Sequence, residues 1–349
     1  MKKNDILSAH NELTITENGD FAVRNELIEQ YKIIDFHTHI YECIYAGLPP
    51  IIRRKTKKNS NSFFDLSCYP GGVSNFSINK IGYRNWPETV FSKEGMNTLL
   101  RLYGKGVLSL IRSATKERLI HDMEKSSINK SVVLPINIKD GNETGETNKA
   151  INGDDRFILF GSVHPFDKNI EQQIDHQLKI GIKGFKINPH VWGIDFDSAE
   201  IRNLIGLLKE TQKPIISCSG IAIPPTFRHL PKGLWRNMRT QDVRKFHYAL
   251  KQFPDIKLIF AHGGLEQNKD LIKLMEEFPN AYSDISLQPS DNIQNMIKKI
   301  GCERLLFGSD YPFINQAFPI LSVLKATESE IERKAIFREN AESILEQDY

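Results

Sequence analysis

Several signals are missing from this sequence, and each absence narrows the class of protein. No run of about 18 apolar residues, the length that crosses a bilayer as a helix, occurs in the chain. The basic start Met1-Lys2-Lys3 is not followed by the apolar core of a signal peptide. The cysteines show no Cys-x-x-Cys spacing, so neither a thiolate cluster nor a disulfide framework is indicated. We therefore expect a reduced, cytoplasmic protein.

An excess of charge of one sign is also missing. The net charge is +3 over 349 residues, and no long basic block occurs. The densest basic run, Arg53-Arg54-Lys55 with Lys57-Lys58, fits a solvated loop better than a phosphate site. Nucleic acid is therefore not an expected partner, and we expect a small-molecule substrate.

A regular alternation of strands and helices is present from about residue 94 onward. Apolar residues three and four apart predict helices, and short β-branched runs predict strands. The helices are expected near 94–126, 143–152, 167–180, 198–211, 239–253, 266–278, 291–300 and 328–346. The strands are expected at 32–37, 131–134, 157–163, 184–188, 214–217, 257–261, 281–285 and 304–307. About eight strand–helix units predict an α/β fold of the closed (β/α)8 TIM-barrel type.

An open, doubly wound sheet is the alternative fold. It is not favoured, because no Gly-x-Gly-x-x-Gly follows the first strand.

Two segments do not follow this alternation of strands and helices. Residues 1–31 are expected to form an N-terminal extension, in which Leu13–Thr16 and Phe21–Val23 pair as a hairpin around Asn18-Gly19. Residues 32–349 are expected to form the barrel. Residues 41–95 are too long for an ordinary connection, so we interpret them as an insertion that could serve as a lid.

The predicted strands end in polar side chains. His37 and His39 close the first strand at a spacing that lets two imidazoles bind one ion. In such a barrel the carboxyl ends of the strands meet at one face, where the chemistry lies. Burying many polar groups there is costly unless they are paired or bind an ion. The other strand ends carry His164, Lys186 with His190, Cys218 between Ser217 and Ser219, His262-Gly263-Gly264, and Asp310.

Five motifs make a family resemblance visible. They are Asp35-Phe36-His37-Thr38-His39, Asp155-Arg156-Phe157, Gly181-Ile182-Lys183-Gly184-Phe185-Lys186, Ala261-His262-Gly263-Gly264 and Leu306-Phe307-Gly308-Ser309-Asp310-Tyr311-Pro312. In order and spacing, over about residues 32 to 345, the chain resembles the amidohydrolase superfamily. Within it, the chain looks like the amidohydrolase-related branch that includes aminocarboxymuconate-semialdehyde decarboxylase.

The resemblance implies a role for each matching residue. His37 and His39 match metal ligands, and Asp310 matches a metal ligand that also accepts a proton. His262 matches the histidine that polarises the substrate or acts as acid and base. The residues alone leave alternatives: His262 as a core histidine bonded to a backbone carbonyl, and Asp310 as a helix N-cap.

One position departs from the family pattern. Cys218 stands where the family usually has a histidine at the end of the fifth strand. A thiolate binds zinc well, so one divalent ion, zinc, with Cys218 as a ligand, is the hypothesis. The alternative is an inert buried cysteine beside a weakened metal site.

Four further residues are candidates for substrate binding: Lys186, His190, His164 and Arg228. A lysine at the position of Lys186 is carboxylated and bridges two metals in some superfamily members, but orienting substrate or pairing with a carboxylate is the commoner use. His164 and His190 could equally be structural. Arg228 lies in a proline-rich loop that could offer its guanidinium to a substrate carboxylate, or simply be solvated.

These observations predict a metal-dependent hydrolase of a small amide, lactone or ester. Non-oxidative decarboxylation of an aromatic or unsaturated acid on the same scaffold is the first alternative. A barrel that has lost its metal and binds a ligand without catalysis is the second. The resemblance also implies a homodimer.

Overall fold

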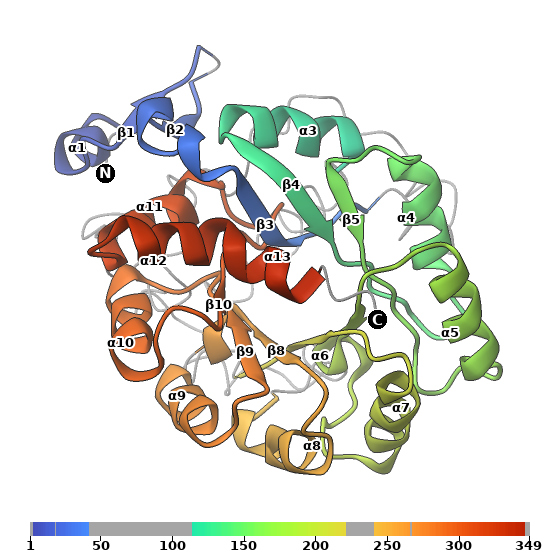
Figure 1. Cartoon of the computed structure of the whole chain (residues 1–349). Helices are drawn as coiled ribbons and strands as arrows, with labels where there is room; N and C mark the ends of the chain where they lie inside the picture. Colours follow the sequence, from blue (N-terminus) through green and yellow to red (C-terminus); the bar gives the residue numbers. More distant parts are fainter. Residues whose placement is uncertain (1–2, 18, 42–113, 221–240, 266, 346–349) are drawn as a thin grey trace, which may run out of the picture.

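A ring of parallel strands surrounded by helices is the main feature of the computed structural model (Figure 1). The structure describes residues 3–17, 19–41, 114–220, 241–265 and 267–345. The strands of the ring are β3 (Ile33–Thr38), β4 (Ile128–Val133), β5 (Phe157–Leu159), β6 (Phe185–Ile187), β7 (Ile215–Cys218), β8 (Leu258–Ala261), β9 (Ala281–Asp284) and β10 (Leu305–Leu306). Each falls on one of the eight predicted strands, although β5 is shorter than the predicted 157–163.

Two parallel sheets share this ring. One has the order β3-β4-β5 and the other β10-β9-β8-β7-β6. Individual backbone hydrogen bonds join their edges on both sides: Lys186 N donates to Gly161 O at 2.7 Å, and Phe36 N donates to Phe307 O at 2.8 Å. The eight strands therefore follow one another around a single axis, as the predicted TIM barrel requires.

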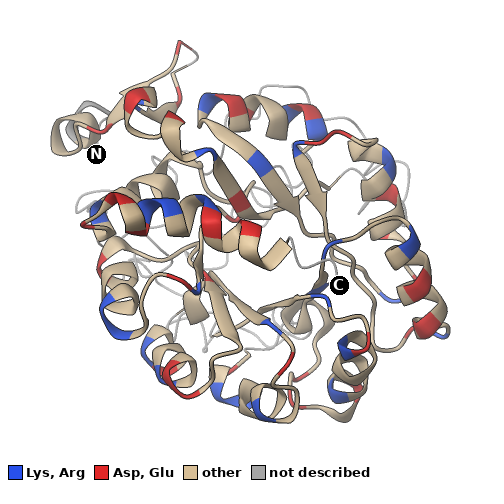
Figure 2. Cartoon of the chain, viewed as in Figure 1, with Lys and Arg blue, Asp and Glu red and all other residues tan. Residues whose placement is uncertain are grey.

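Helices cover the outside of the ring (Figure 1). They are α3 (Lys116–Lys125), α4 (Glu143–Ile151), α5 (Ile170–Lys179), α7 (Ala199–Lys209), α8 (His247–Gln252), α9 (Asn268–Glu277), α10 (Ser290–Ile300) and α11 (Ala317–Ala326). The short helix α6 (Pro189–Trp192) follows β6 directly and lies inside this outer layer in Figure 1. Most carry an apolar stripe toward the strands, as in α7, where Ile201, Leu204 and Leu208 are buried. Figure 2 shows Lys and Arg next to Asp and Glu on these helices in this view, in keeping with the small net charge.

The interior of the barrel is packed by apolar side chains rather than open. Its core cluster contains Ile34, Phe36, Val132, Leu134, Phe160, Ile216, Ile259, Ala261, Leu306, Ala341 and Ile344. The last two belong to α13 (Asn340–Leu345), which lies across the ring in Figure 1. Lys257 immediately precedes β8, and its Nζ donates to Ser343 O at 3.5 Å. α13 therefore closes the end of the barrel at which the strands begin.

The N-terminal residues pack against the side of the barrel. After α1 (Lys3–Ala9), β1 (Leu13–Ile15) and β2 (Phe21–Val23) pair antiparallel, which confirms the predicted hairpin. The ring of Phe21 lies 5.5 Å from that of Phe318 in α11, and Asn315 Nδ2 donates to Phe21 O at 3.2 Å. Two 3-10 turns, Asn25–Leu27 and Glu29–Tyr31, lead into β3.

The sequence prediction was wrong for α11, which was not expected. Eight of its ten residues are buried, so it lacks the polar face that marks an amphipathic helix, and it contains Pro319.

The predicted helix 328–346 is α12 (Glu330–Lys334), a π-helical segment (Ala335–Glu339) and α13 in succession. A capping box at Ser329 and Glu332 starts it.

The predicted helix 94–126 does not run unbroken. α3 begins only at Lys116, because Thr115 is extended and its hydroxyl accepts from Arg118 N as an N-cap. The proposed insertion 41–95, from residue 42 on, and the start of that helix lie outside the described residues. Among the described residues, no helix is both long enough and apolar enough to cross a membrane.

Candidate metal centre and active site

His37 and His39 lie at the carboxyl end of β3, and their rings are 5.1 Å apart between centroids. Phe36 belongs to the interior cluster, so an unbroken strand would turn His37 to the opposite side. The pairing of β3 with β4 shifts register between Asp35 and Thr38, and such irregularities redirect side chains near active sites.

The Nδ1 atoms of both histidines are already engaged. His37 Nδ1 donates to Asp284 Oδ2 at 2.8 Å, and His39 Nδ1 donates to Leu134 O at 2.8 Å. Carboxylate and carbonyl oxygens only accept, so each ring carries its proton on Nδ1 when neutral. Each Nε2 therefore keeps a lone pair for a ligand, which is the arrangement that metal-binding histidines use.

Asp310 approaches these two lone pairs from the segment after β10. Its Oδ1 is 3.7 Å from His37 Nε2 and 3.8 Å from His39 Nε2. The backbone of Asp310 is left-handed, with φ of 59°, and its N donates to His37 O at 2.9 Å. Left-handed backbone is unfavourable for aspartate and recurs at functional sites. Because α11 begins only at Ala317, with Gln316 before it, Asp310 is not its N-cap.

The three donors fit a divalent cation. Nitrogen and oxygen ligands about 2.0–2.1 Å from a tetrahedral ion lie roughly 3.4 Å apart, a few tenths of an ångström closer than here. Burial and nearby Lys186 hold the pKa of His37 well below its ordinary value and lower that of His39 to about 3. Both rings are therefore neutral, as metal binding requires. Burial raises the pKa of Asp310 well above its usual value, and a bound cation would offset that cost.

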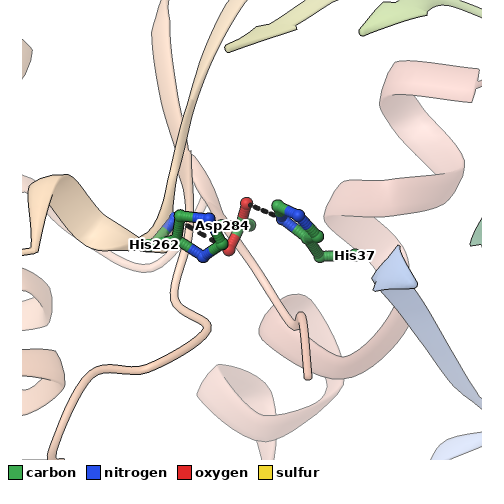
Figure 3. A group of neighbouring side chains, drawn as sticks. All are labelled: His37, His262 and Asp284. Atoms are coloured by element: carbon green, nitrogen blue, oxygen red, sulfur yellow. Dashed lines mark hydrogen bonds and ion pairs between the residues drawn. The ribbon is translucent and has the colours of Figure 1, made fainter. Parts of the chain in front are cut away.

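Asp284, at the end of β9, lies between His37 and His262 (Figure 3). Its Oδ1 accepts from His262 N at 3.1 Å, from Ser286 N at 3.0 Å and from Ser286 Oγ at 2.5 Å. His37, His262 and Asp284 form a second group of clustered ligand atoms. The 2.8 Å contact between His37 and Asp284 is a hydrogen bond that leaves no room for an ion between them.

His262 is held by side chains rather than by a backbone carbonyl. Ser286 Oγ donates its proton to Asp284, so it can only accept the hydrogen bond that joins it to His262 Nδ1 at 2.8 Å. His262 is therefore protonated on Nδ1 and carries its lone pair on Nε2, which faces Cys218 Sγ at 4.0 Å. Burial holds the pKa of His262 well below its ordinary value, so the ring is neutral.

Asp35 joins the first and last strands of the barrel. Its Oδ1 accepts from Ser309 N at 2.9 Å and from His37 N at 3.2 Å. Its Oδ2 accepts from Ser309 Oγ at 2.5 Å and from Gln316 Nε2 at 3.1 Å. These bonds fix the residue before Asp310 relative to the backbone of His37, and so set the spacing of two of the three ligands.

Cys218 and Lys186 complete the buried cluster. Cys218 follows the interior residue Ile216 by two positions on β7, so its side chain also faces the interior. Burial raises the pKa of its thiol, while Lys186 acts in the opposite direction. Lys186 is almost fully buried on β6, and its Nζ lies 3.5 Å from His37 Nε2. The structure thus brings both residues to the group that His37 and His262 form.

The three remaining substrate candidates differ in their placement. His190, on α6, donates from Nε2 to Gly220 O at 3.2 Å, and its buried Nδ1 has no hydrogen-bond partner among the described residues. His164 is buried, its ring lies 5.1 Å from that of Trp192, and its Nδ1 accepts from Phe166 N. Arg228 lies outside the described residues.

Asp284 and Ser286 were missed by the sequence analysis. The signal was available, because an acidic residue stands inside the predicted strand 281–285 and a serine follows it. Neither residue was among the predicted site residues. Asp35 was noted as part of a motif but received no role.

Comparison with known protein families agrees with this geometry. A family model described as Amidohydrolase matches residues 147–346, more than half of the chain. The chain belongs to the amidohydrolase family. Members of this superfamily use a divalent metal ion, and the grouped His and Asp side chains could hold one. The family match confirms the predicted resemblance and membership of an enzyme family. No curated protein matches the sequence.

Solved structures confirm the barrel fold. An uncharacterised TIM-barrel protein from Bordetella bronchiseptica is 18% identical, with a TM-score of 0.61 over 90% of this chain and 98% of that one. A 5-carboxyvanillate decarboxylase from Sphingomonas paucimobilis is 13% identical, with a TM-score of 0.58 over 90% and 98%. A probable 2-pyrone-4,6-dicarboxylic acid hydrolase from Acinetobacter baumannii is 14% identical, with a TM-score of 0.53 over 90% and 99%.

Proposed function

We propose that this amidohydrolase is a metal-dependent hydrolase of a small amide, lactone or ester. The observation that carries the proposal is the convergence of His37 Nε2, His39 Nε2 and Asp310 Oδ1 at the carboxyl end of the barrel. Both Nε2 atoms carry lone pairs because the Nδ1 atoms of the two rings donate to Asp284 and to Leu134 O.

A divalent ion, when bound, lowers the pKa of a water ligand and polarises a substrate carbonyl. Asp310 is placed to accept a proton from the attacking water and to return it to the leaving group. His262 offers an unprotonated Nε2 toward the same space. It would accept a hydrogen bond or a proton from the substrate, which is the acid–base role that the family resemblance implies.

We propose zinc as the ion and Cys218 as an additional ligand. The support is the position of the thiol, 4.0 Å from His262 Nε2, on the strand where the family pattern has a histidine. Sulfur favours zinc over manganese or magnesium.

Replacing Cys218 with alanine should lower the zinc affinity and the zinc-to-protein ratio, and replacing it with histidine should restore both. Cys302 is equally buried and packs in the outer core, so Cys302→Ala is the matched control. Unchanged zinc binding in Cys218→Ala would remove this residue from the ligand set.

We propose further that the substrate carries a carboxylate. Lys186 brings an ammonium group to the buried cluster, 3.5 Å from His37 Nε2. Its charge suits a substrate carboxylate better than a second cation. The unpartnered Nδ1 of His190 is an acceptor that a hydroxyl or amide of the substrate would satisfy. Arg228 and His164 remain predicted substrate contacts.

Non-oxidative decarboxylation is the second candidate, and the decarboxylase among the similar structures supports it. The raised pKa of Asp310 also suits a group that delivers a proton to the carbon losing CO2.

Incubation with lactones, amides and aromatic acids, with trapping of CO2, separates the two reactions. A hydrolysed product without CO2 supports the hydrolase, and CO2 release without hydrolysis supports the decarboxylase.

Measuring the metal content of the purified protein distinguishes an enzyme, whether hydrolase or decarboxylase, from a barrel that binds a ligand without catalysis. Tightly bound zinc in a stoichiometric amount supports an enzyme, and its absence after purification with added zinc supports the non-catalytic alternative. The cytoplasmic location and the homodimer remain predictions, the second of which light scattering would test.

A further inference from the structure

We infer that Asp284 is a positioning residue that couples the metal ligand His37 to His262. It would do so by fixing the proton positions of both imidazoles, directly for His37 and through Ser286 for His262. The inference rests on the proposed function in one respect, namely that His37 binds the ion through Nε2.

Hydrogen-bond donors surround both oxygens of the Asp284 carboxylate. Oδ2 accepts from His37 Nδ1, and Oδ1 accepts from His262 N, Ser286 N and Ser286 Oγ. The side chain is completely buried. A carboxylate is the side chain that accepts at both oxygens without offering a proton, so these contacts require an ionised aspartate.

An asparagine of the same shape cannot satisfy both sides. If its amide NH2 faces His37, the Nδ1 of that ring must become an acceptor, and the proton moves to Nε2, where the metal lone pair is needed. If the NH2 faces Ser286 instead, it meets two backbone N–H donors, and the hydroxyl loses its acceptor. The hydroxyl is then free to donate to His262 Nδ1, which shifts that ring's proton to Nε2.

The backbone supports the same conclusion. His262 has a left-handed conformation with φ of 62°, which is unfavourable for a residue with a Cβ. Its N is held by Asp284 Oδ1, and its O accepts from Gln288 Nε2 at 2.7 Å. Asp284 therefore positions the main chain of His262 as well as the proton on its ring.

Two variants separate the link of Asp284 to His37 from its link, through Ser286, to His262. Asp284→Asn should disturb the link to His37, because the amide oxygen is better used on the side of the three donors and the NH2 then faces His37 Nδ1. Ser286→Ala removes only the link to His262. The probe is zinc alone, titrated in competition with a chelator, so no substrate is needed. We expect Asp284→Asn to weaken zinc binding by roughly 10- to 100-fold, the range typical for outer-shell partners of metal-binding histidines. Ser286→Ala should bind zinc within about threefold of the wild type, because His37 keeps its partner.

Nitrogen-15 spectra of histidine-labelled protein supply a second readout. In the wild type without metal, His37 and His262 should both carry their proton on Nδ1. Ser286→Ala should move the His262 proton toward Nε2 and leave His37 unchanged. Once a substrate is known, this variant should lower kcat by about tenfold or more with little change in KM.

Equal zinc affinity in Asp284→Asn and wild type would overturn the inference, as would an Nε2 proton on either ring of the wild type. If Asp284→Asn does not fold, the wild-type spectrum and Ser286→Ala decide. Failure of the proposed function would look different, since the wild type would then bind no zinc while its imidazoles still carried their protons on Nδ1.

Discussion

The two ends of the barrel are built from the same strands but from opposite kinds of side chain. Where the strands begin, Ile34, Ile216 and Ile259 pack against α13 in an apolar cluster. Two positions further along, Ile216 gives way to Cys218, and Tyr282 gives way to Asp284. A period of two residues keeps these pairs on the same face of their strands. One strand thus packs at one end and presents ligands at the other.

This difference predicts that stability and function separate along the barrel axis. The amino end contributes apolar burial, roughly 25 cal/mol per Å² removed from water. The carboxyl end buries carboxylates and imidazoles, whose desolvation costs free energy unless their hydrogen bonds remain intact. Substitutions at the two ends should therefore move different measured quantities.

The largest expected effect is at the carboxyl end, in Asp310→Asn. Loss of a proton acceptor and metal ligand should lower turnover by about 10³-fold or more and reduce bound metal. The unfolding midpoint without metal should not fall, because the carboxylate is costly to bury in the absence of a cation. His247 lies at the surface, beside Glu277, and His247→Ala serves as the control. Normal turnover in Asp310→Asn would contradict the proposed site.

At the amino end, Ile259→Ala should cost about 2–5 kcal/mol of unfolding free energy by leaving a cavity in the interior cluster. Urea unfolding measures this cost. Metal bound per folded molecule should stay at the wild-type level. Ile331 is 76% exposed, so Ile331→Ala should change stability by no more than about 0.5 kcal/mol. A loss of metal affinity in folded Ile259→Ala would show that the two ends are not independent.

The pH dependence of the unfolding free energy tests the cost of burying a polar group, His190, at the carboxyl end of the barrel. Burial lowers its pKa to about 4 in the folded protein, against 6.5 for an ordinary histidine. The unfolded chain therefore binds this proton first, and the stability that neutral His190 contributes is lost as pH falls from 6.5 toward 4. Between pH 7 and pH 5 the loss should be ~2 kcal/mol. Urea unfolding of His190→Gln should show a correspondingly weaker pH dependence. An identical dependence in both proteins would mean that His190 is not buried in its neutral form.

The smallest effect is expected away from both ends, at the start of α7. Ser198 Oγ accepts from Ile201 N as an N-cap, so Ser198→Ala should cost about 1 kcal/mol of unfolding free energy. Zinc affinity and turnover should match the wild type. Ser198→Asp, which keeps a capping oxygen, should restore most of the lost stability.

The sequence predicted the strands well because most are short runs of apolar, often β-branched, residues between turn residues. It predicted the grouping of His37, His39 and Asp310 because parallel strands bring their carboxyl ends to one face. It did not predict α11, whose residues are apolar on all sides, nor the start of α3 at Thr115. The contacts of Asp284 and Ser286 were not predictable either, because a pattern gives the strand but not the atom toward which a side chain turns.

The bonds of Asp35 to Ser309 join residues 274 positions apart. The side chains that would hold the ion come from both sides of this junction, His37 and His39 near the start of the chain and Asp310 near its end. During synthesis, the histidines emerge from the ribosome long before the aspartate. The complete ligand set can therefore form only after β10 has been made and has docked beside β3. Zinc would then be a late addition to a nearly finished barrel, rather than a nucleus around which the chain folds.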